Sequence, residues 1–347
     1  MAGPLALAAA LIVTGLVLVR LVDVLLLIFG AVLFAILLNA IAAPLRTRTP
    51  LGRIGSLVAA VIVTALAIAA ILWAFGSKLD SQLASLADMV PRAWDDFQAR
   101  LSRSTLGALL LRELDALPGP DGGWLSLAPR VAANAASGLA ATVIVIFAGL
   151  YLAFHPRTYA EGLVRLFPRD LRARALEILA AIHDALKRWL LAQLLSMALV
   201  GSTTALGLWL VGAPFPIGLG VLAGLGQFVP VVGPMAAAVP GLLVALAAGP
   251  QVLAMTAGVY LVAAQLEANV ITPLVLRRMA ALPMAVTLFA VLAMGVLLGP
   301  LGVLLATPLA VVAYVLVKMV YVEDVLGDGP EAPVIAAKPF WRRRRGP

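Results

Sequence analysis

Apolar residues run in long blocks along this chain, and short polar segments separate them. A block of about 20 apolar residues crosses the hydrocarbon core of a bilayer as a helix that rises 1.5 Å per residue. The strands of a transmembrane barrel would alternate polar and apolar residues, and that alternation is missing. The pattern therefore predicts an all-α, polytopic membrane protein with about eight transmembrane helices.

The order of the blocks predicts six segments, and within the first of them we expect a tight turn between Arg20 and Asp23 to separate two spans. The segments are N-terminal transmembrane helices over 1–76, an extracytoplasmic amphipathic helical segment over 77–130, a transmembrane helix over 131–154, cytoplasmic amphipathic helices over 155–189, a transmembrane core over 190–322 and a basic cytoplasmic tail over 323–347.

The core contains an apolar stretch, Gly218 to Ala247, that prolines break at Pro230 and Pro234. Each arm is too short to span a bilayer, and proline disfavours helix in the residue before it. We therefore expect a re-entrant helical hairpin over 217–248. Backbone groups freed at such a break must contact protein or line a polar cavity, because they cannot face lipid.

A second break follows at Gly299 to Gly302 and separates the apolar arms Pro283–Leu298 and Val303–Val322. The sequence leaves open whether 283–298 is a span or a second re-entrant element. Counting both arms as spans gives the eight crossings.

Two polar segments show helical periodicity and are expected to be amphipathic helices. In 77–130 the apolar stripe covers the protein's own membrane domain or packs on a neighbouring subunit, and both readings stay open. In 155–189 the apolar side predicts an interfacial helix that lies along the membrane. The stripes are Leu79, Leu83, Leu86, Val90, Trp94, Phe97 and Leu101, and then Leu171, Ala175, Ile178, Ile182, Leu186 and Trp189.

Composition supports a membrane protein, because 63% of the 347 residues are hydrophobic, 12% are charged and the mean hydropathy is +1.06. The net charge of +8 comes from basic clusters in short loops and in the tail, which is typical of cytoplasmic flanks rather than of nucleic-acid binding. We therefore place both termini in the cytoplasm. Segment 77–130 carries six basic and seven acidic residues, which favours the outer side.

Reactive groups for enzyme chemistry are scarce in the sequence. It has no cysteine and two distant histidines, so we expect neither disulfides nor a thiolate or histidine metal site. It has no P-loop and neither a GxSxG nor an HExxH pattern. We therefore expect no enzyme and no cofactor.

Polar residues inside apolar blocks are the first candidates for function, because they are costly there. Glu267 could accept a proton or a sodium ion, or it could form hydrogen bonds in a helix contact. Gln265 and Asn269 share one helix face, and Glu267 points about 160° away from it. Pro273 adds a kink that frees a carbonyl. Gln227, beside the proline break, faces a cavity or bonds another helix.

Three motifs resemble the autoinducer-2 exporter family, also called PerM-like permeases. They are GLGVLAGLGQFVPVVGP from Gly218 to Pro234, QLEANVITP from Gln265 to Pro273, and GPLGVLLATP from Gly299 to Pro308. The resemblance implies a multispan transporter of the bacterial inner membrane, with export of autoinducer-2 or sodium/proton exchange in different members. It also implies a homo-oligomer, for which a pentamer is one expectation. The residues carried over by motif position are Gln227, Pro230, Gly233, Pro234, Gln265, Glu267, Asn269 and Pro273.

The leading hypothesis is a secondary transporter of a small polar solute, with those residues along the solute or ion path. A sodium/proton antiporter of the same fold is an alternative. From another functional class, a non-transporting oligomeric scaffold in the bilayer remains open.

Overall fold

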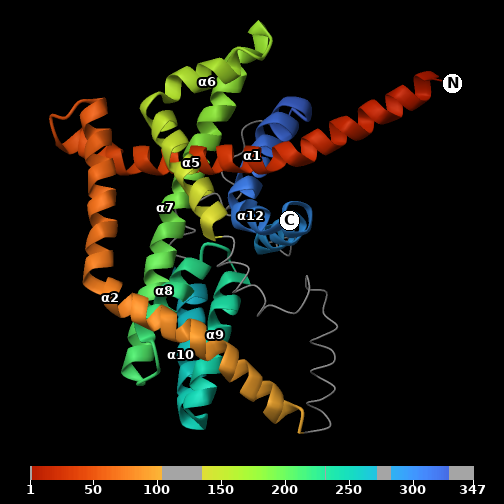
Figure 1. Cartoon of the computed structure of the whole chain (residues 1–347). Helices are drawn as coiled ribbons and strands as arrows, with labels where there is room; N and C mark the ends of the chain where they lie inside the picture. Colours follow the sequence, from red (N-terminus) through yellow and green to blue (C-terminus); the bar gives the residue numbers. More distant parts are fainter. Residues whose placement is uncertain (1, 104–134, 231, 272–282, 328–347) are drawn as a thin grey trace, which may run out of the picture.

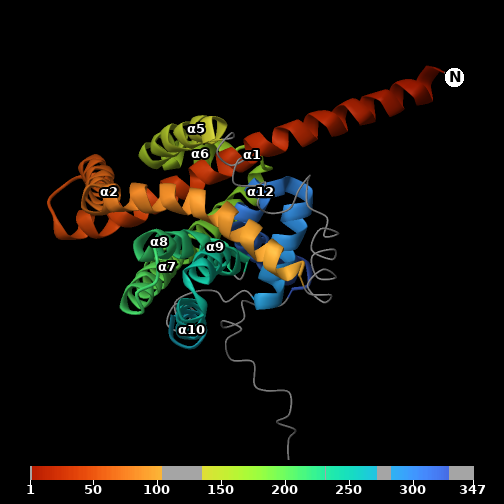
Figure 2. The ribbon, with the colours of Figure 1, turned by 60° about the horizontal axis from the view of Figure 1, so that its bottom comes forward.

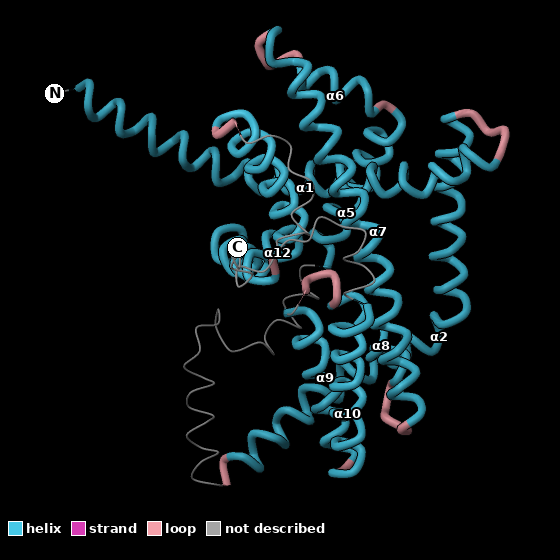
Figure 3. Tube along the Cα trace, turned by 180° about the vertical axis from the view of Figure 1, so that it is seen from behind, coloured by secondary structure: helices cyan, strands magenta, loops and turns pink. Residues whose placement is uncertain are grey.

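The computed structural model describes residues 2–103, 135–230, 232–271 and 283–327, and these residues form helices joined by short loops without any strand (Figures 1 and 3). The predicted all-helical fold class is therefore confirmed for the described part of the chain. Candidate residue Pro273 lies outside the described residues.

The first helix, α1, runs from Ala2 to Arg48 without interruption. The expected tight turn between Arg20 and Asp23 is wrong, because only Leu21 and Val22 lie between those charges and neither residue breaks a helix. The N-terminal part of α1 projects beyond the other helices, as Figures 1 and 2 show.

Helix α2 runs from Arg53 to Leu101, so the third predicted span and the predicted amphipathic segment form one helix. It changes direction along its length and crosses the α8–α9 region (Figure 1). Met89 and Val90 pack against a buried cluster of Leu208, Leu219 and Val244. This part of the stripe covers the protein's own membrane domain, as the first of the two readings expected.

Helix α5 spans Ala135–Phe154. After His155 the axis bends by 86° into α6, Pro156–Val164. Proline at the first position of α6 costs no hydrogen bond, since that N–H has no partner inside a helix. After a short 3₁₀ turn, η2 (Arg169–Leu171), the long helix α7 runs from Arg172 to Leu210.

The continuity of α7 corrects the prediction of a separate interfacial helix up to residue 189. A helix collinear with a span cannot lie along the membrane plane. Its apolar side, including Leu186 and Trp189, is buried against residues of α1 and of the later helix α12 such as Leu33 and Leu305. The apolar side of this segment is therefore buried against other helices of the protein, whereas the sequence predicted burial in the membrane surface.

Three short helices pack together beside the C-terminal half of α7 (Figures 1 and 3). They are α8, Pro216–Gly226, then α9, Val232–Ala248, and α10, Pro250–Leu266, which continues into the π-helical turn η3, Glu267–Ile271. Each of α8 and α10 begins with a proline at its first position. The predicted break is present as the turn between α8 and α9, and we call this pair the α8–α9 hairpin.

The last helix, α12, spans Met284–Leu316 and bends at Gly299, whose φ of 64° is in the left-handed region. Residues eight apart in sequence touch across this bend: a Cβ on Gly302 would lie 2.3 Å from the carbonyl oxygen of Met294. The predicted turn at Gly299–Gly302 is therefore confirmed. The π-helix η4, Val317–Val325, continues the chain.

Four helices in the described residues are long and apolar enough to cross a membrane, and the number rises to five if the bent pair α5–α6 counts as one span. The count of eight is not confirmed. The arms α8 and α9 are both shorter than a span, as expected, since they comprise 11 and 17 residues.

Candidate functional site at the turn between α8 and α9

The turn that joins α8 to α9 holds its backbone through local hydrogen bonds. The N–H groups of Phe228 and Val229 donate to the carbonyls of Leu225 and Gly226, and Gly233 N–H donates to Val229 O at 3.0 Å. Pro230 terminates the turn, and Pro234 lies in the first turn of α9, where a missing N–H costs nothing. The prolines therefore end one helix and begin the next.

A glycine pair lets the two arms of the hairpin touch. A Cβ added to Gly233 would lie 1.7 Å from the carbonyl oxygen of Gly226, and one added to Gly226 would lie 2.7 Å from the oxygen of Gly233. No side chain fits at either position without displacing backbone. Gly233, selected from the sequence by its motif, is thus a packing residue at the crossing of α8 and α9.

Gln227 is at the centre of a polar cluster, although only 3% of its surface is exposed. Its side-chain amide donates to a carboxylate oxygen of Glu267 in η3 and to the hydroxyl of Ser196 in α7 at 3.5 Å. Its backbone carbonyl accepts a hydrogen bond from the amide of Gln193, one turn before Ser196. We call Gln193, Ser196, Gln227 and Glu267 the inner polar cluster.

The inner polar cluster provides a hydrogen-bond partner for a backbone group at the break between α8 and α9. The Gln227 carbonyl, freed at the end of α8, takes its partner from α7, as the sequence predicted for backbone groups at the break. The side-chain oxygen Oε1 of Gln227 is buried without a hydrogen-bond partner among the described residues. A buried acceptor of this kind costs about 1–3 kcal/mol.

Gln265 and Asn269 are not part of this cluster. They are exposed, and the Asn269 amide donates to the side-chain oxygen of Gln265 at 2.9 Å and to its carbonyl at 3.0 Å. Glu267, by contrast, points inward to Gln227. The predicted separation of this motif into two helix faces is confirmed, and only Glu267 reaches the turn.

Gln193 and Ser196 are the members of the cluster that were not among the candidates chosen from the sequence. Their spacing of three residues places both on one face of α7, which is a signal that the sequence contains. What the sequence lacks is the pairing of that face with the turn, because 31 residues separate Ser196 from Gln227.

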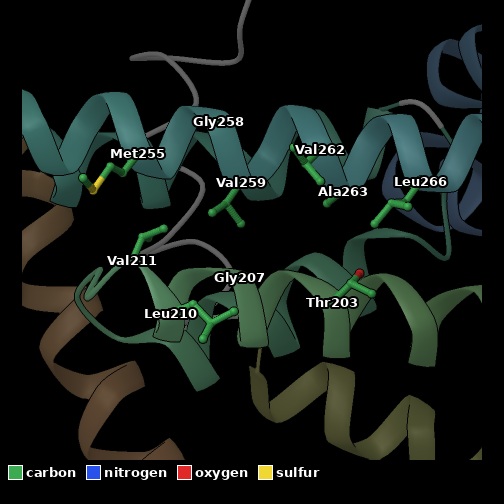
Figure 4. A pocket seen from close by; sticks show the side chains of 10 residues that line it. All are labelled: Thr203, Gly207, Leu210, Val211, Met255, Gly258, Val259, Val262, Ala263 and Leu266. Carbon is green, nitrogen blue, oxygen red and sulfur yellow. The ribbon is translucent and has the colours of Figure 1, made fainter.

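A pocket of about 340 Å³ lies between α7 and α10 and extends to Leu266, the residue before Glu267 (Figure 4). Its lining is apolar apart from Thr203, whose hydroxyl is already bonded to the carbonyl of Leu199 at 2.7 Å. The pocket can hold hydrocarbon next to Glu267, whereas the hydrogen-bonding groups are in the inner polar cluster.

A second polar cluster is at the opposite end of α7. Arg174 contacts Glu177 of its own helix and, 150 residues later, Glu323 and Asp324 of η4, at distances of 2.8 to 3.0 Å. The sequence assigned Arg174, Glu323 and Asp324 to one side of the membrane, and the structure brings them together.

Contacts also join α2, α7, α8 and α10 at the other end of α7. Gln82 of α2 accepts a hydrogen bond from the N–H of Gly218 at 2.9 Å, which satisfies a donor in the first turn of α8. Val211 and Met255 line one pocket, so the end of α7 and the start of α10 are adjacent. Gln82 belongs to segment 77–130, whose charge balance favours the outer side.

Comparison with known proteins gives one family over nearly the whole chain. A family model described as AI-2E family transporter matches residues 5–321. "Putative transport protein YrrI" of Bacillus subtilis is 29% identical over 151 residues, which are 44% of this chain and 43% of that protein.

Two further relatives carry the same kind of name. "Putative transport protein YueF" of Bacillus subtilis is 27% identical over 53% of this chain and 48% of its own length. "Putative transport protein MT0215" of Mycobacterium tuberculosis is 32% identical over 48% of this chain and 46% of its own length. The matches thus span about half the length of each relative.

Proposed function

The chain belongs to the AI-2E transporter family, and on this basis we propose that it is a secondary transporter that moves a small polar solute across a bacterial inner membrane. The solute passes the turn between α8 and α9, and the α8–α9 hairpin is re-entrant. Pro230, Gly233 and Pro234 hold the shape of this turn.

The observation that carries the proposal is the unpaired Oε1 of Gln227. Both donors of the same amide are occupied by Ser196 and Glu267, so the amide cannot turn to satisfy its oxygen without losing the bond to the carboxylate. The oxygen is thereby held ready to accept a hydrogen bond from a solute. A purely structural glutamine would pair all its buried groups.

Glu267 is the proposed gate or coupling group. It is half-buried and supplies the carboxylate of the inner polar cluster, bonded directly to Gln227. A change in its protonation or ion occupancy changes the partner of the Gln227 amide, and therefore the orientation of the solute-binding oxygen. This connection links the charge of one residue to the shape of the path.

Reconstitution in liposomes tests the proposal. We expect the native chain to move at least one small polar solute across the membrane, and Glu267→Gln to change the rate by tenfold or more, about 1.4 kcal/mol in barrier height. The matched control is Glu323→Gln, an acid of the Arg174 cluster at the end of η4. Its flux should stay within twofold of the native chain.

A sodium/proton antiporter is the second candidate, favoured by the carboxylate in the inner polar cluster. Sodium-driven proton movement that disappears in Glu267→Gln would support the antiporter. Uptake of a neutral polar solute by the native chain without sodium-driven proton movement would support the exporter. No flux of any solute or ion from the native chain would contradict transport and leave the oligomeric scaffold.

We also propose a homo-oligomer, for which a pentamer is the expected size, with both termini in the cytoplasm. The paired amides of Gln265 and Asn269 support this proposal, because polar side chains on an exposed membrane face bond readily to a neighbouring helix. The variant Gln265→Cys tests this proposal by cross-linking in membranes. The native chain has no cysteine, so the introduced thiol is the one that reacts.

A further inference from the structure

Four buried side-chain polar atoms in the described residues have no hydrogen-bond partner in the protein. They are Oγ1 of Thr204, Oε1 of Gln227, Oγ1 of Thr256 and Oη of Tyr260. Thr204 and Thr256 are 1% and 0% exposed, so their hydroxyls reach no outer surface. Native structures contain few such atoms, and each one calls for an explanation.

These atoms belong to three neighbouring elements. On α10 and its continuation η3, Thr256, Tyr260 and Glu267 are spaced by four and seven residues, which places them within about 40° of one another around the helix. On α7, Ser196 and Thr204 are eight residues apart, within about 80°. Gln227 ends α8. The unpaired atoms of Thr256 and Tyr260 therefore share one side of α10 with Glu267, and that of Thr204 lies near the side of α7 that carries Ser196.

Both sides face the α8–α9 hairpin. From α10, Tyr260 lies against Gly241 of α9, where an added Cβ would be 2.2 Å from the phenol oxygen, and Glu267 contacts Gln227. From α7, Ser196 contacts Gln227, and Leu208, one turn beyond Thr204, packs in the cluster that Tyr260 also contacts. The unpaired hydroxyls and the inner polar cluster therefore lie on the sides of α7 and α10 that face the α8–α9 hairpin.

We propose that Thr204, Thr256 and Tyr260 line a hydrogen-bonding track that leads from the Val211 end of α7 to Gln227 and Glu267. The inference rests on the proposed function and extends it by naming further path residues and a solute class. Hydroxyl groups both donate and accept hydrogen bonds, and the named residues carry no positive charge. The track therefore takes a neutral, hydroxyl-bearing or amide-bearing solute and disfavours anions.

Stability measurements separate this role from a structural one. Thr256→Val and Thr204→Val keep the side-chain shape and remove an unpaired hydroxyl, so the melting temperature should stay equal or rise. Solute flux should fall by about fivefold, the value of one hydrogen bond. The matched control is Thr203→Val, since that hydroxyl is bonded to its own helix and lines the apolar pocket. Unchanged flux in both buried variants would overturn the track.

Thiol labelling gives a readout that does not depend on transport. The chain has no cysteine, so Thr204→Cys, Thr256→Cys and the fully buried control Leu208→Cys each carry a single thiol. A small neutral methanethiosulfonate reagent reacts with a thiolate, which forms in a polar, hydrated site. In membranes we expect the two threonine positions to react at least tenfold faster than position 208.

The outcomes distinguish the two claims. Reaction at 204 and 256 without flux in the native chain would reject the proposed function and retain the track. Flux in the native chain with both thiols as slow as position 208 would reject the track. An anionic sulfonatoethyl reagent should react more slowly than the neutral one, and equal rates would overturn the assigned solute class.

Discussion

The two helical hairpins that pack on α7 use the same backbone device and different polar contacts. Glycine and proline break the chain between α8 and α9 and again at Gly299 within α12. The first hairpin meets α7 through neutral, buried groups around Gln227. The second is joined to α7 through the charges of Arg174, Glu323 and Asp324, which are only partly buried.

This difference teaches that a broken helix is not by itself a site. At Gly299 the residues of the turn are Gly299, Pro300, Leu301 and Gly302, none with a polar side chain. At Gln227 the amide, the hydroxyl of Ser196 and the carboxylate of Glu267 come from three elements. Function is expected where buried polar groups from several helices converge on the break.

The largest effect should come from filling the hairpin crossings. Gly233→Ala places a Cβ 1.7 Å from a backbone oxygen, and Gly302→Ala places one at 2.3 Å, so each should cost about 3 kcal/mol or more. Thermal unfolding in detergent measures the loss. Gly258→Ala, with nothing within 4 Å, is the control and should melt like the native chain. Equal melting of all three variants would contradict the close crossings.

The next effect concerns transport alone. Gln227→Leu removes the amide that binds Glu267 and leaves that carboxylate unpaired, so flux in liposomes should fall by tenfold or more. Gln251→Leu, an exposed amide at the start of α10, is the matched control and should leave flux unchanged. Similar flux in both variants would contradict a functional role for the polar contacts of Gln227 at the α8–α9 break.

A smaller effect is expected from Gln193→Leu, because it deprives the freed carbonyl of Gln227 of its partner. An unpaired buried carbonyl costs about 1–3 kcal/mol, so the melting temperature should fall while the chain still folds. Chemical or thermal unfolding measures it. A native melting temperature would mean that another group satisfies the carbonyl.

The smallest effect should come from Arg174→Met, which removes the charged link between α7 and η4. The side chain of Arg174 is 30% exposed, and ion pairs of this kind contribute about 1 kcal/mol or less. The difference from the native chain should shrink further in 1 M salt, where charges are screened. A loss of several kcal/mol would show that the second hairpin depends on this link as the first depends on Gln227.

The sequence predicted the parts of the fold that local chemistry controls. Pro230, Pro234 and Gly299 mark real breaks, and the spacing of Gln265, Glu267 and Asn269 divides that motif correctly between two helix faces. Charge placement also assigned Arg174 and Glu323 to the same side of the membrane, and the two side chains are in contact. Each of these features depends on a residue type or on spacing within one helix.

Predictions that required a helix to end without a breaking residue were wrong. Arg20 and Asp23 are charged yet helix-compatible, and α7 has no glycine or proline between Arg172 and Val200. The hydroxyls of Thr204, Thr256 and Tyr260 were missed for another reason. A threonine in a helix usually bonds its own backbone, as Thr203 does, so only the packed structure shows which hydroxyls do not.

The unbroken helix α7 has a mechanical consequence for any transport cycle. Its 39 residues form a rod of about 58 Å, close to twice the hydrocarbon thickness. Ser196 and Gln193 meet one hairpin on this rod, while Leu186 and Arg174 meet the other helical hairpin and its extension. A rotation of the rod about its long axis would therefore shift both contacts at once, so that movement at the Arg174 end is transmitted to the carboxylate of Glu267.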